Sequence, residues 1–198
     1  MPAVPARDAI TGLILAGGRG QRLGGVDKGL QAWRGLPLVD HALARLAPQV
    51  REVMISANRN AAEYARRATR VLGDASDDFP GPLAGILAGL RAAATPWLAV
   101  VPCDSPRLPH DLVERLARGV GDARGAVVQR EHRDGGLRLE PVCCLLSTAL
   151  ADDLERYLAD GGRKVEGWIA THAARVPFDG ADDATAFANI NTPGDLAR

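Results

Sequence analysis

The chain has 198 residues with 24 basic and 24 acidic side chains, so its formal net charge at pH 7 is zero. This length predicts one domain or at most two small ones, and a hydrophobic content of 46% excludes a disordered chain. The balanced charge excludes a general nucleic-acid-binding protein, which would carry a basic surplus. Only Lys28 and Lys164 are lysines; all the other basic residues are arginines. Both lysines are of interest because an ammonium and a guanidinium are not interchangeable at a tight site.

Signals for a cellular compartment are few. The three cysteines form no C-x-x-C pair, and their odd number argues against a disulfide framework or a standard zinc site. No stretch approaches the ~18 apolar residues of a membrane span, and residues 1–9 lack the apolar core of a signal peptide. We therefore expect a cytoplasmic protein without membrane contact, with a flexible tail at residues 1–9 and a single domain at residues 10–198.

Strand and helix patterns alternate four times in the first half of the chain. Compact apolar runs predict strands at residues 10–15, 53–57, 71–72 and 97–101. Apolar residues on one helical face predict helices at residues 38–46, 60–68, 82–90 and 109–116. Asn60 is placed to cap the second of these helices. The alternation predicts a three-layer α/β domain, in which a mostly parallel twisted sheet carries helices on both faces.

The second half of the chain is less regular. It predicts strands at residues 126–130, 140–146 and 175–178, with a turn at residues 134–136 and a helix at residues 150–158. Because the strand at 140–146 returns after a tight turn, we expect mixed strand directions here. Thr192 is expected to cap a final helix whose first residue is Pro193.

The least ordinary residues follow the predicted strands. They are Gly17 and Gly18, Ser56 to Asn58, Asp74 and Asp104. Ligands of parallel sheets bind at the carboxyl ends of the strands, so the sequence predicts a binding site along this edge.

The segment at residues 15–28, Leu-Ala-Gly-Gly-Arg-Gly-Gln-Arg-Leu-Gly-Gly-Val-Asp-Lys, is the most informative. Six glycines lie within residues 17–29, where exposed backbone N–H groups suit phosphate oxygens. Arg19, Arg22 and Lys28 add positive charge. The spacing lacks both the G-x-x-x-x-G-K-[ST] of a P-loop and the third glycine of G-x-G-x-x-G. The bland alternative is a tight turn with surface arginines.

A different group of enzymes fits this spacing. Residues 15–24 resemble the Leu-Ala-Gly-Gly-x-x-x-Arg-Leu-Gly opening of nucleotidyltransferases, which attach NMP to a phosphorylated acceptor. The continuation Gly-Gly-Val-Asp-Lys-Gly-Leu is more specifically similar to that of the molybdenum cofactor guanylyltransferase family. Four more segments match in order, at residues 73–86, 102–106, 140–141 and 189–196, so the resemblance extends over residues 10–198.

The resemblance implies a Rossmann-like nucleotidyltransferase fold that transfers GMP from GTP to the terminal phosphate of molybdopterin, with Mg²⁺ as cofactor. It implies a nucleotide-binding half at residues 10–120 and an acceptor-binding half at residues 121–198. The implied catalytic residues are Lys28, Asp104 and Arg22, with Asp104 as the metal ligand. The implied nucleotide-binding residues are Leu15, Ala16, Gly17, Gly18, Lys28, Ser56, Asn58, Asp74, Gly81 and Asp104. The implied acceptor-binding residues are Asn189, Asn191, Arg163 and Lys164.

Several alternatives remain open at the level of sequence. The chain could be a related transferase that uses CTP or a sugar-phosphate acceptor, because such enzymes have the same opening loop. It could also be a non-catalytic nucleotide sensor with the same fold. Several candidate residues also have a purely structural explanation. Arg163 and Lys164 could belong to a solvated face, and Asn189 and Asn191 could serve as turn or cap residues. Gly85 could be required for close packing of its helix. We expect a monomer that binds no nucleic acid, with molybdopterin-synthesis proteins and molybdoenzyme chaperones as implied partners.

Overall fold

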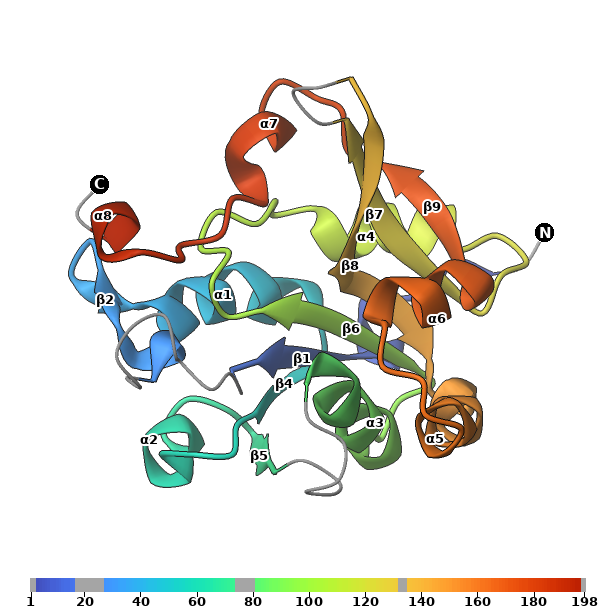
Figure 1. Cartoon of the computed structure of the whole chain (residues 1–198), viewed down its shortest axis with the longest axis horizontal. Helices are drawn as coiled ribbons and strands as arrows, with labels where there is room; N and C mark the ends of the chain where they lie inside the picture. The colour runs from blue at the N-terminus through green and yellow to red at the C-terminus, as the bar shows by residue number, and fades with distance from the viewer. Residues whose placement is uncertain (1–2, 17–26, 74–80, 132–134, 197–198) are drawn as a thin grey trace.

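The computed structural model describes residues 3–16, 27–73, 81–131 and 135–196 (Figure 1). A seven-stranded sheet forms its centre, in the order β5-β4-β1-β6-β8-β7-β9. These strands are β1 (Ile10–Leu15), β4 (Glu52–Ser56), β5 (Arg70–Leu72), β6 (Trp97–Pro102), β7 (Gly125–Glu131), β8 (Leu137–Ser147) and β9 (Ala173–Pro177). A separate hairpin pairs β2 (Ala32–Trp33) with β3 (Leu36–Pro37).

Helices connect the strands in chain order. The α-helices are α1 (Leu38–Leu46), α2 (Ala61–Ala65), α3 (Pro82–Ala92), α4 (Leu112–Gly119), α5 (Ala151–Ala159), α6 (Val165–His172), α7 (Asp183–Ala186) and α8 (Pro193–Leu196). The 3₁₀ turns are η1 (Arg7–Ala9), η3 (Lys28–Leu30), η4 (Ala47–Gln49) and η5 (Thr148–Leu150). None of the described helices is long and apolar enough to cross a membrane.

Strand directions confirm the predicted sheet. β1 lies parallel to β4 and β6, and β4 lies parallel to β5. β8 runs antiparallel to both β6 and β7, and β9 is parallel to β7. The sheet is therefore mostly parallel, and the mixed directions arise in the C-terminal half as expected.

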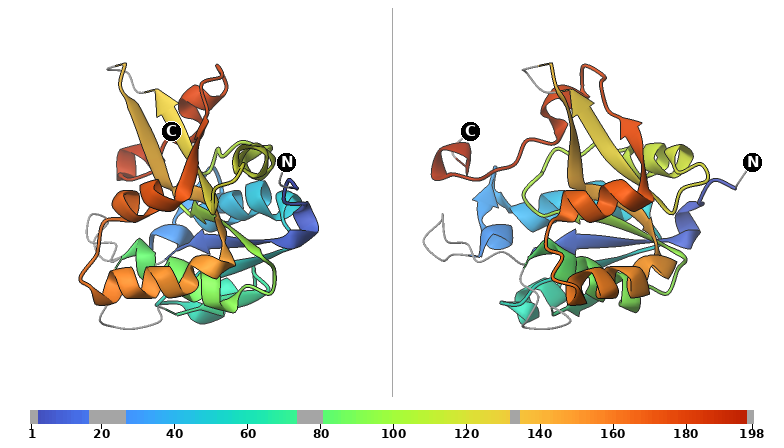
Figure 2. Two further views of the ribbon diagram at one scale, coloured as in Figure 1. Left: turned by 90° about the vertical axis from the view of Figure 1, so that its right-hand side faces the viewer. Right: turned by 45° about the vertical axis from the view of Figure 1, so that its right-hand side comes forward.

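Two hydrophobic clusters cover the two faces of the sheet. Alternate residues of a strand point to opposite faces, so Ile10 and Ile14 of β1 join one cluster and Leu13 joins the other. The first cluster includes the buried faces of α1 and α4, and the second includes those of α3, α5 and α6. Figure 2 shows α3, α5 and α6 together on one side, which completes the predicted three layers.

β8 is bent where it passes its neighbours. Val127 of β7 pairs with Cys144, but the next residue, Val128, pairs with Glu140, so β8 bulges at residues 141–143. Pro141 lies in the bulge, where its missing N–H costs no ladder hydrogen bond. The outer part of β8 therefore leaves β6 and continues with β7 alone (Figure 1).

The structure corrects several predicted helices. Asn60 does not cap α2: its φ is +54°, it forms no side-chain cap bond, and its amide instead donates to Asp27. α2 is correspondingly short, ending at Ala65, and α4 begins at Leu112 because Asp111 is not helical. The β2–β3 hairpin and α6 had no sequence prediction. The predicted cap at Thr192 is confirmed, because its hydroxyl accepts from the backbone N–H of Asp195 at 3.2 Å.

Candidate active site

Four parallel strands end level with one another. Leu15 of β1 pairs with Ser56 of β4 and with Pro102 of β6, while Ser56 also pairs with Leu72 of β5. Backbone hydrogen bonds connect the residues that follow these strands. For example, the N–H of Ala16 donates to the carbonyl oxygen of Ser56 at 2.9 Å. The strand ends at which we predict binding therefore form one continuous rim.

Three polar side chains meet at this rim. The Nζ atom of Lys28 lies 2.5 Å from Oδ2 of Asp104 and 2.5 Å from Oδ1 of Asn191, and it donates to both oxygens. Asp104 follows β6, Lys28 opens η3, and Asn191 precedes α8. The structure thus brings together three sequence-predicted residues that are 76 and 163 positions apart along the chain. We call this group the rim cluster.

Asp104 has an oxygen available for a ligand. Its Oδ1 atom is buried and has no hydrogen-bond partner among the described residues. An unsatisfied buried carboxylate oxygen is costly, so its presence indicates a site for a ligand. No group of three or more His, Cys, Asp or Glu among the described residues is arranged to hold a metal. A single carboxylate still fits Mg²⁺, which usually takes one or two carboxylates together with phosphate oxygens and water.

The C-terminal segment at residues 189–191 packs directly over the Asp104 loop. The backbone N–H of Ile190 donates to the carbonyl oxygen of Asp104 at 2.9 Å. The Ser105 hydroxyl donates to Oδ1 of Asn189 at 2.7 Å. Ile190 itself is buried in a small cluster with Trp33 and Leu38. This segment, which we call the C-terminal strap, therefore holds both predicted asparagines beside Asp104.

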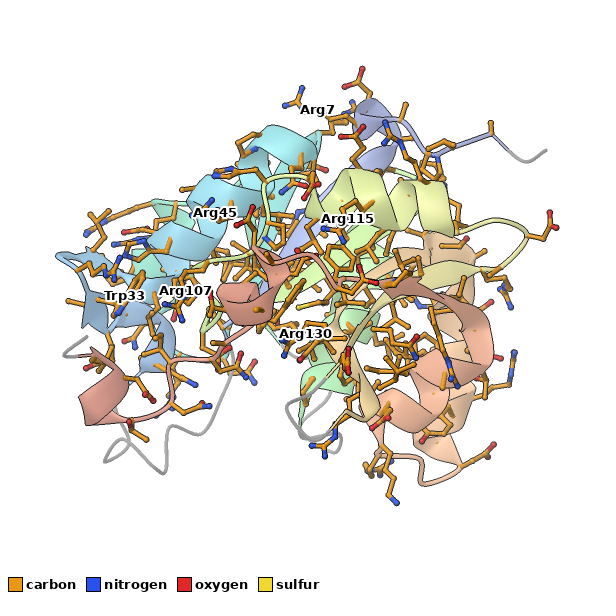
Figure 3. The ribbon with its side chains drawn as sticks, turned by 90° about the horizontal axis from the view of Figure 1, so that it is seen from above. Arg7, Trp33, Arg45, Arg107, Arg115 and Arg130 are labelled. Carbon is orange, nitrogen blue, oxygen red and sulfur yellow. The ribbon has the colours of Figure 1, made fainter. Side chains whose placement is uncertain are left out.

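Trp33 forms the hydrophobic support of the strap. The guanidinium carbons of Arg34 and Arg107 lie 4.5 Å and 6.0 Å from its ring centroid, within cation–π range. The edge of the His41 ring packs on it at 4.9 Å. Figure 3 shows Trp33 and Arg107 side by side. The sequence pattern does not predict this support, because it depends on the unpredicted β2–β3 hairpin.

A second unpredicted group anchors the residue before Lys28. Oδ1 of Asp27 accepts from the Tyr64 hydroxyl at 2.5 Å and from the Gly29 N–H at 3.2 Å. Oδ2 of Asp27 accepts from the Asn60 side-chain amide at 2.9 Å. We call this group the Asp27 anchor. The only sequence signal for it was the position of Asp27 beside the predicted lysine.

The structure describes some of the predicted nucleotide-binding residues and not others. Leu15 and Ala16 lie at the end of β1, whereas Gly17, Gly18 and Asp74, together with the predicted catalytic residue Arg22, lie outside the described residues. Asn58 is exposed beyond the end of β4, and Gly81 precedes α3 with φ of +117°. Ser56 is only 2% exposed, so its side chain belongs to the frame of the rim rather than to its surface.

Gly85 explains how closely α3 approaches that frame. A Cβ atom at Gly85 would lie 2.6 Å from the Ser56 hydroxyl and 2.9 Å from Cδ2 of Leu15. Both distances are shorter than real Cβ contacts. The geometry supports the close-packing alternative for Gly85.

Arg163 and Lys164 occupy the connection between α5 and α6. Nη1 of Arg163 donates to the carbonyl oxygens of Leu158 and Gly162 at 2.8 Å and 2.7 Å. The Tyr157 hydroxyl donates to the carbonyl oxygen of Lys164 at 3.2 Å. These contacts join the connection to residues of α5 and to its own backbone. The connection lies on the opposite side of the molecule from α8 in Figure 1. The asparagines of the strap, by contrast, lie at the rim.

A further ion pair joins β7 to β8 beside the bulge. Nη2 and Nε of Arg130 lie 2.5 Å and 3.0 Å from Oε1 of Glu140, and the guanidinium lies 5.2 Å from the centroid of Phe187. Burial, followed by the charges of Glu140, Cys144 and Asp104, raises the pKa of the Cys143 thiol.

The cysteine beside Asp104 has no nucleophilic character. Burial, together with the charge of Asp104, raises the pKa of the Cys103 thiol to about 12, so it stays protonated near neutral pH. The rim thus offers an ammonium, a carboxylate and amides, which suit binding of a polyphosphate rather than covalent catalysis.

Comparisons with known proteins agree with this chemistry. A family model described as the MobA-like NTP transferase domain matches residues 12–176. The chain is 52% identical to the molybdenum cofactor guanylyltransferase of Ralstonia nicotianae, over 98% of this chain and 97% of that protein. It is 53% identical to the molybdenum cofactor guanylyltransferase of Cupriavidus necator, over 96% of each protein.

Solved structures share the fold at much lower identity. The molybdopterin-guanine dinucleotide biosynthesis protein A of Archaeoglobus fulgidus is 24% identical, with a TM-score of 0.73 over 94% of this chain and 95% of that one. The 4-diphosphocytidyl-2C-methyl-D-erythritol synthase of Anaerococcus prevotii is 11% identical, with a TM-score of 0.73 over 96% and 93% of the two chains. These likenesses confirm the nucleotidyltransferase fold. By its family match and its full-length relatives, the chain belongs to the MobA-like NTP transferase family and, within it, to the molybdenum cofactor guanylyltransferases.

Proposed function

We propose that this protein transfers GMP from GTP to the terminal phosphate of molybdopterin, with release of pyrophosphate and formation of the guanine dinucleotide. The observation that carries the proposal is the rim cluster of Lys28, Asp104 and Asn191, at the carboxyl edge of the sheet in a chain of this family. In the proposed reaction an oxygen of the acceptor phosphate attacks the α-phosphorus in line. The bond from that phosphorus to the pyrophosphate oxygen breaks, and no protein nucleophile is used.

Asp104 is the residue proposed to hold Mg²⁺, through its buried and unpartnered Oδ1 atom. When bound, the ion neutralises negative charge on the triphosphate. Lys28 offsets the charge that develops on the leaving pyrophosphate, and Arg22 is proposed to add to this effect. Asn191 orients the Lys28 ammonium by accepting from it. The chain's contribution is thus positioning and charge neutralisation, which dominate catalysis of this kind of transfer.

The nucleoside is proposed to bind along the first half of the rim. Leu15, Ala16 and Ser56 form its floor, and Asn58 lies exposed at the side. Asp74 stays a prediction as an acceptor for guanine N–H groups, which adenine does not present in the same pattern. The peptide groups of Gly17, Gly18 and Gly81 are proposed to face the phosphates.

The acceptor phosphate is proposed to bind beside the strap, near Asn189 and Asn191. The hydrogen bonds of Ser105 and Lys28 already orient both amides there. Arg163 and Lys164 stay acceptor-binding predictions, although the exposure of both side chains favours the alternative of a solvated face.

The decisive experiment incubates the protein with GTP, Mg²⁺ and molybdopterin and measures pyrophosphate and the dinucleotide. Parallel incubations replace GTP with CTP or ATP. Of the three nucleotides, we expect only GTP to give pyrophosphate and the dinucleotide. A preference for CTP above roughly tenfold, equivalent to about 1.4 kcal/mol, would replace the proposal with the related cytidylyl activity. Nucleotide binding without any turnover would instead indicate a sensor.

A further inference from the structure

We propose that the Asp27 anchor positions Lys28 relative to the part of the rim where the nucleoside is proposed to bind. The inference rests on the proposed function, because it assigns these residues a part in GMP transfer. None of the three anchor side chains touches the Lys28 ammonium, which points instead to Asp104 and Asn191. Asp27, Asn60 and Tyr64 are therefore positioning residues and not catalytic ones.

The Asp27 carboxylate uses both oxygens to tie separate parts of the chain together. One oxygen accepts from the Tyr64 hydroxyl and from the Gly29 N–H, and the other accepts from the Asn60 amide. Tyr64 is fully buried against the first hydrophobic cluster, so its hydroxyl has no freedom to move away. Burial, and then the hydrogen bond to Asp27, raises the pKa of Tyr64 well above its usual range, so the hydroxyl remains a donor.

Lys28 is thereby fixed from two directions. Asp27 and Gly29, its chain neighbours, are both held against Tyr64, and its own ammonium is held by Asp104 and Asn191. A Cβ atom at Gly29 would lie 2.5 Å from the Tyr64 hydroxyl, so the backbone here is pressed directly onto the tyrosine. Only glycine allows this approach.

The conformation of Asn60 does not serve to cap α2. Its φ of +54° is left-handed, a region that asparagine adopts more readily than most residues other than glycine, and its side chain gives no cap bond to α2. The amide reaches instead across 33 positions to Asp27. Asn60 follows Asn58 by two residues, so this bond joins the segment proposed to bind the nucleoside to the residue before Lys28. Alignment of these two segments matters because misplaced groups lose much of their effect on phosphoryl transfer.

The test uses a coincidence of composition: the chain has only two tyrosines and two lysines. Tyr64 is linked to Lys28 through Asp27, and Tyr157 donates to the carbonyl oxygen of Lys164. Tyr64→Phe is therefore the test variant and Tyr157→Phe its matched control. Biosynthetic labelling with ¹³C,¹⁵N-lysine gives two sets of side-chain signals, one for each lysine, in NMR spectra of the protein without ligands.

We expect Tyr64→Phe to shift the Lys28 side-chain signals and increase their mobility while leaving those of Lys164 in place. Tyr157→Phe should do the reverse. In the transfer assay, Tyr64→Phe should lower kcat by roughly tenfold, the scale of a hydrogen bond to a charged group. KM for GTP should change much less, because the phosphate-binding groups are still present but misaligned. Unfolding in urea separates this effect from a simple loss of stability.

Asn60→Gly provides a second variant that does not disturb the core. Glycine accepts a φ of +54° without strain, so the substitution removes the bond to Asp27 and keeps the backbone path. It should move the Lys28 signals in the same direction as Tyr64→Phe. Unchanged Lys28 signals in both variants would overturn the inference, as would unchanged kcat when those signals move. If the wild-type protein makes no dinucleotide, the proposed function fails, yet the NMR comparison still decides whether the anchor positions Lys28.

Discussion

At the scale of single residues, Asp104 is the position where charge matters most. Its Oδ2 atom pairs with Lys28, and its buried Oδ1 atom has no partner among the described residues. Asp104→Asn keeps the shape of the side chain but removes the negative charge. We expect the fold to persist and kcat with Mg²⁺ and GTP to fall by more than roughly tenfold, since metal-bridged charge stabilisation contributes several kcal/mol.

The measurement for Asp104→Asn pairs steady-state kinetics with urea unfolding of the same protein. A variant that unfolds at nearly the wild-type urea concentration but turns over slowly supports the assignment. Activity above a tenth of the wild-type value would show that Asp104 does not hold the metal.

Lys28 tests whether charge alone is enough at the rim. Its ammonium donates to oxygens of two different residues, Asp104 and Asn191, at 2.5 Å each. A guanidinium carries the same charge but is planar and larger, so it cannot donate in both directions from one atom. Lys28→Arg should keep measurable GTP binding yet lower kcat, by roughly tenfold or more if transition-state alignment is lost. Calorimetry and kinetics, with Lys28→Met as the uncharged reference, check this; an arginine variant with wild-type kcat would contradict it.

The motifs predicted Lys28, Asp104 and Asn191, but not the contacts among them. Asp104 is 76 residues from Lys28, and Asn191 is 163 residues away, so only the assembled sheet brings them together. The anchor residues Asn60 and Tyr64 escaped prediction for a different reason. Asparagine is a common N-cap residue, and Asn60 lies where the sequence predicts the start of a helix. The local pattern does not show that its amide donates to Asp27, 33 positions earlier in the chain.

At the scale of secondary structure elements, the packing of α3 on the strand ends makes the rim rigid. Gly85 lies where any larger residue would press on Ser56 and Leu15. Gly85→Ala should therefore destabilise the protein by about 1–2 kcal/mol, because the overpacking penalty exceeds the gain in helix propensity. The displaced strand ends should also weaken GTP binding.

Gly167 offers the matched control for this substitution. It is exposed in α6, and a Cβ atom there would have its nearest neighbours at 3.7 Å and 3.8 Å, which are ordinary contacts. Gly167→Ala should stabilise the protein by up to about 1 kcal/mol. Urea unfolding of both variants checks the pair, and equal effects would show that close packing at Gly85 is unimportant.

Two of the elements without a prediction, the β2–β3 hairpin and α6, share a physical reason. Each strand of the β2–β3 hairpin is two residues long, too short to show an alternating pattern. α6 buries only Trp168 and Ile169, and it contains Gly167 and three further exposed positions, so its sequence shows little helical periodicity. Both elements depend on tertiary contacts, with Trp33 packed under the strap and Trp168 packed on the sheet.

At the scale of the whole molecule, the alternating first half predicted the parallel sheet correctly, and the predicted strand ends do meet along one edge. It succeeded because strands buried on both faces are short apolar runs that glycine, proline or aspartate terminates. The second half was predicted only in outline. The bulge at residues 141–143 and the insertion of β8 between β6 and β7 come from pairing between strands, which a single strand's pattern does not encode.

The reaction rates of the three cysteine thiols can show whether the molecule unfolds as one unit or opens locally. All are buried: Cys103 and Cys143 lie on one face of the sheet, and Cys144 lies on the other. Burial raises the pKa of all three thiols, so none is reactive in the folded protein. If the two layers open only together with the sheet, the three thiols should react with a disulfide reagent at rates that agree within roughly a factor of two.

GTP with Mg²⁺ sharpens this last prediction. A ligand that binds only the folded protein at 100 times its Kd lowers the population of globally opened molecules by about 100-fold. All three thiols should therefore react about 100-fold more slowly, as mass spectrometry of the labelled peptides can measure for each cysteine separately. Slowing confined to Cys103, next to Asp104, would show instead that the rim opens on its own. In that case the rigid positioning of Lys28 would depend on bound nucleotide and not on the fold alone.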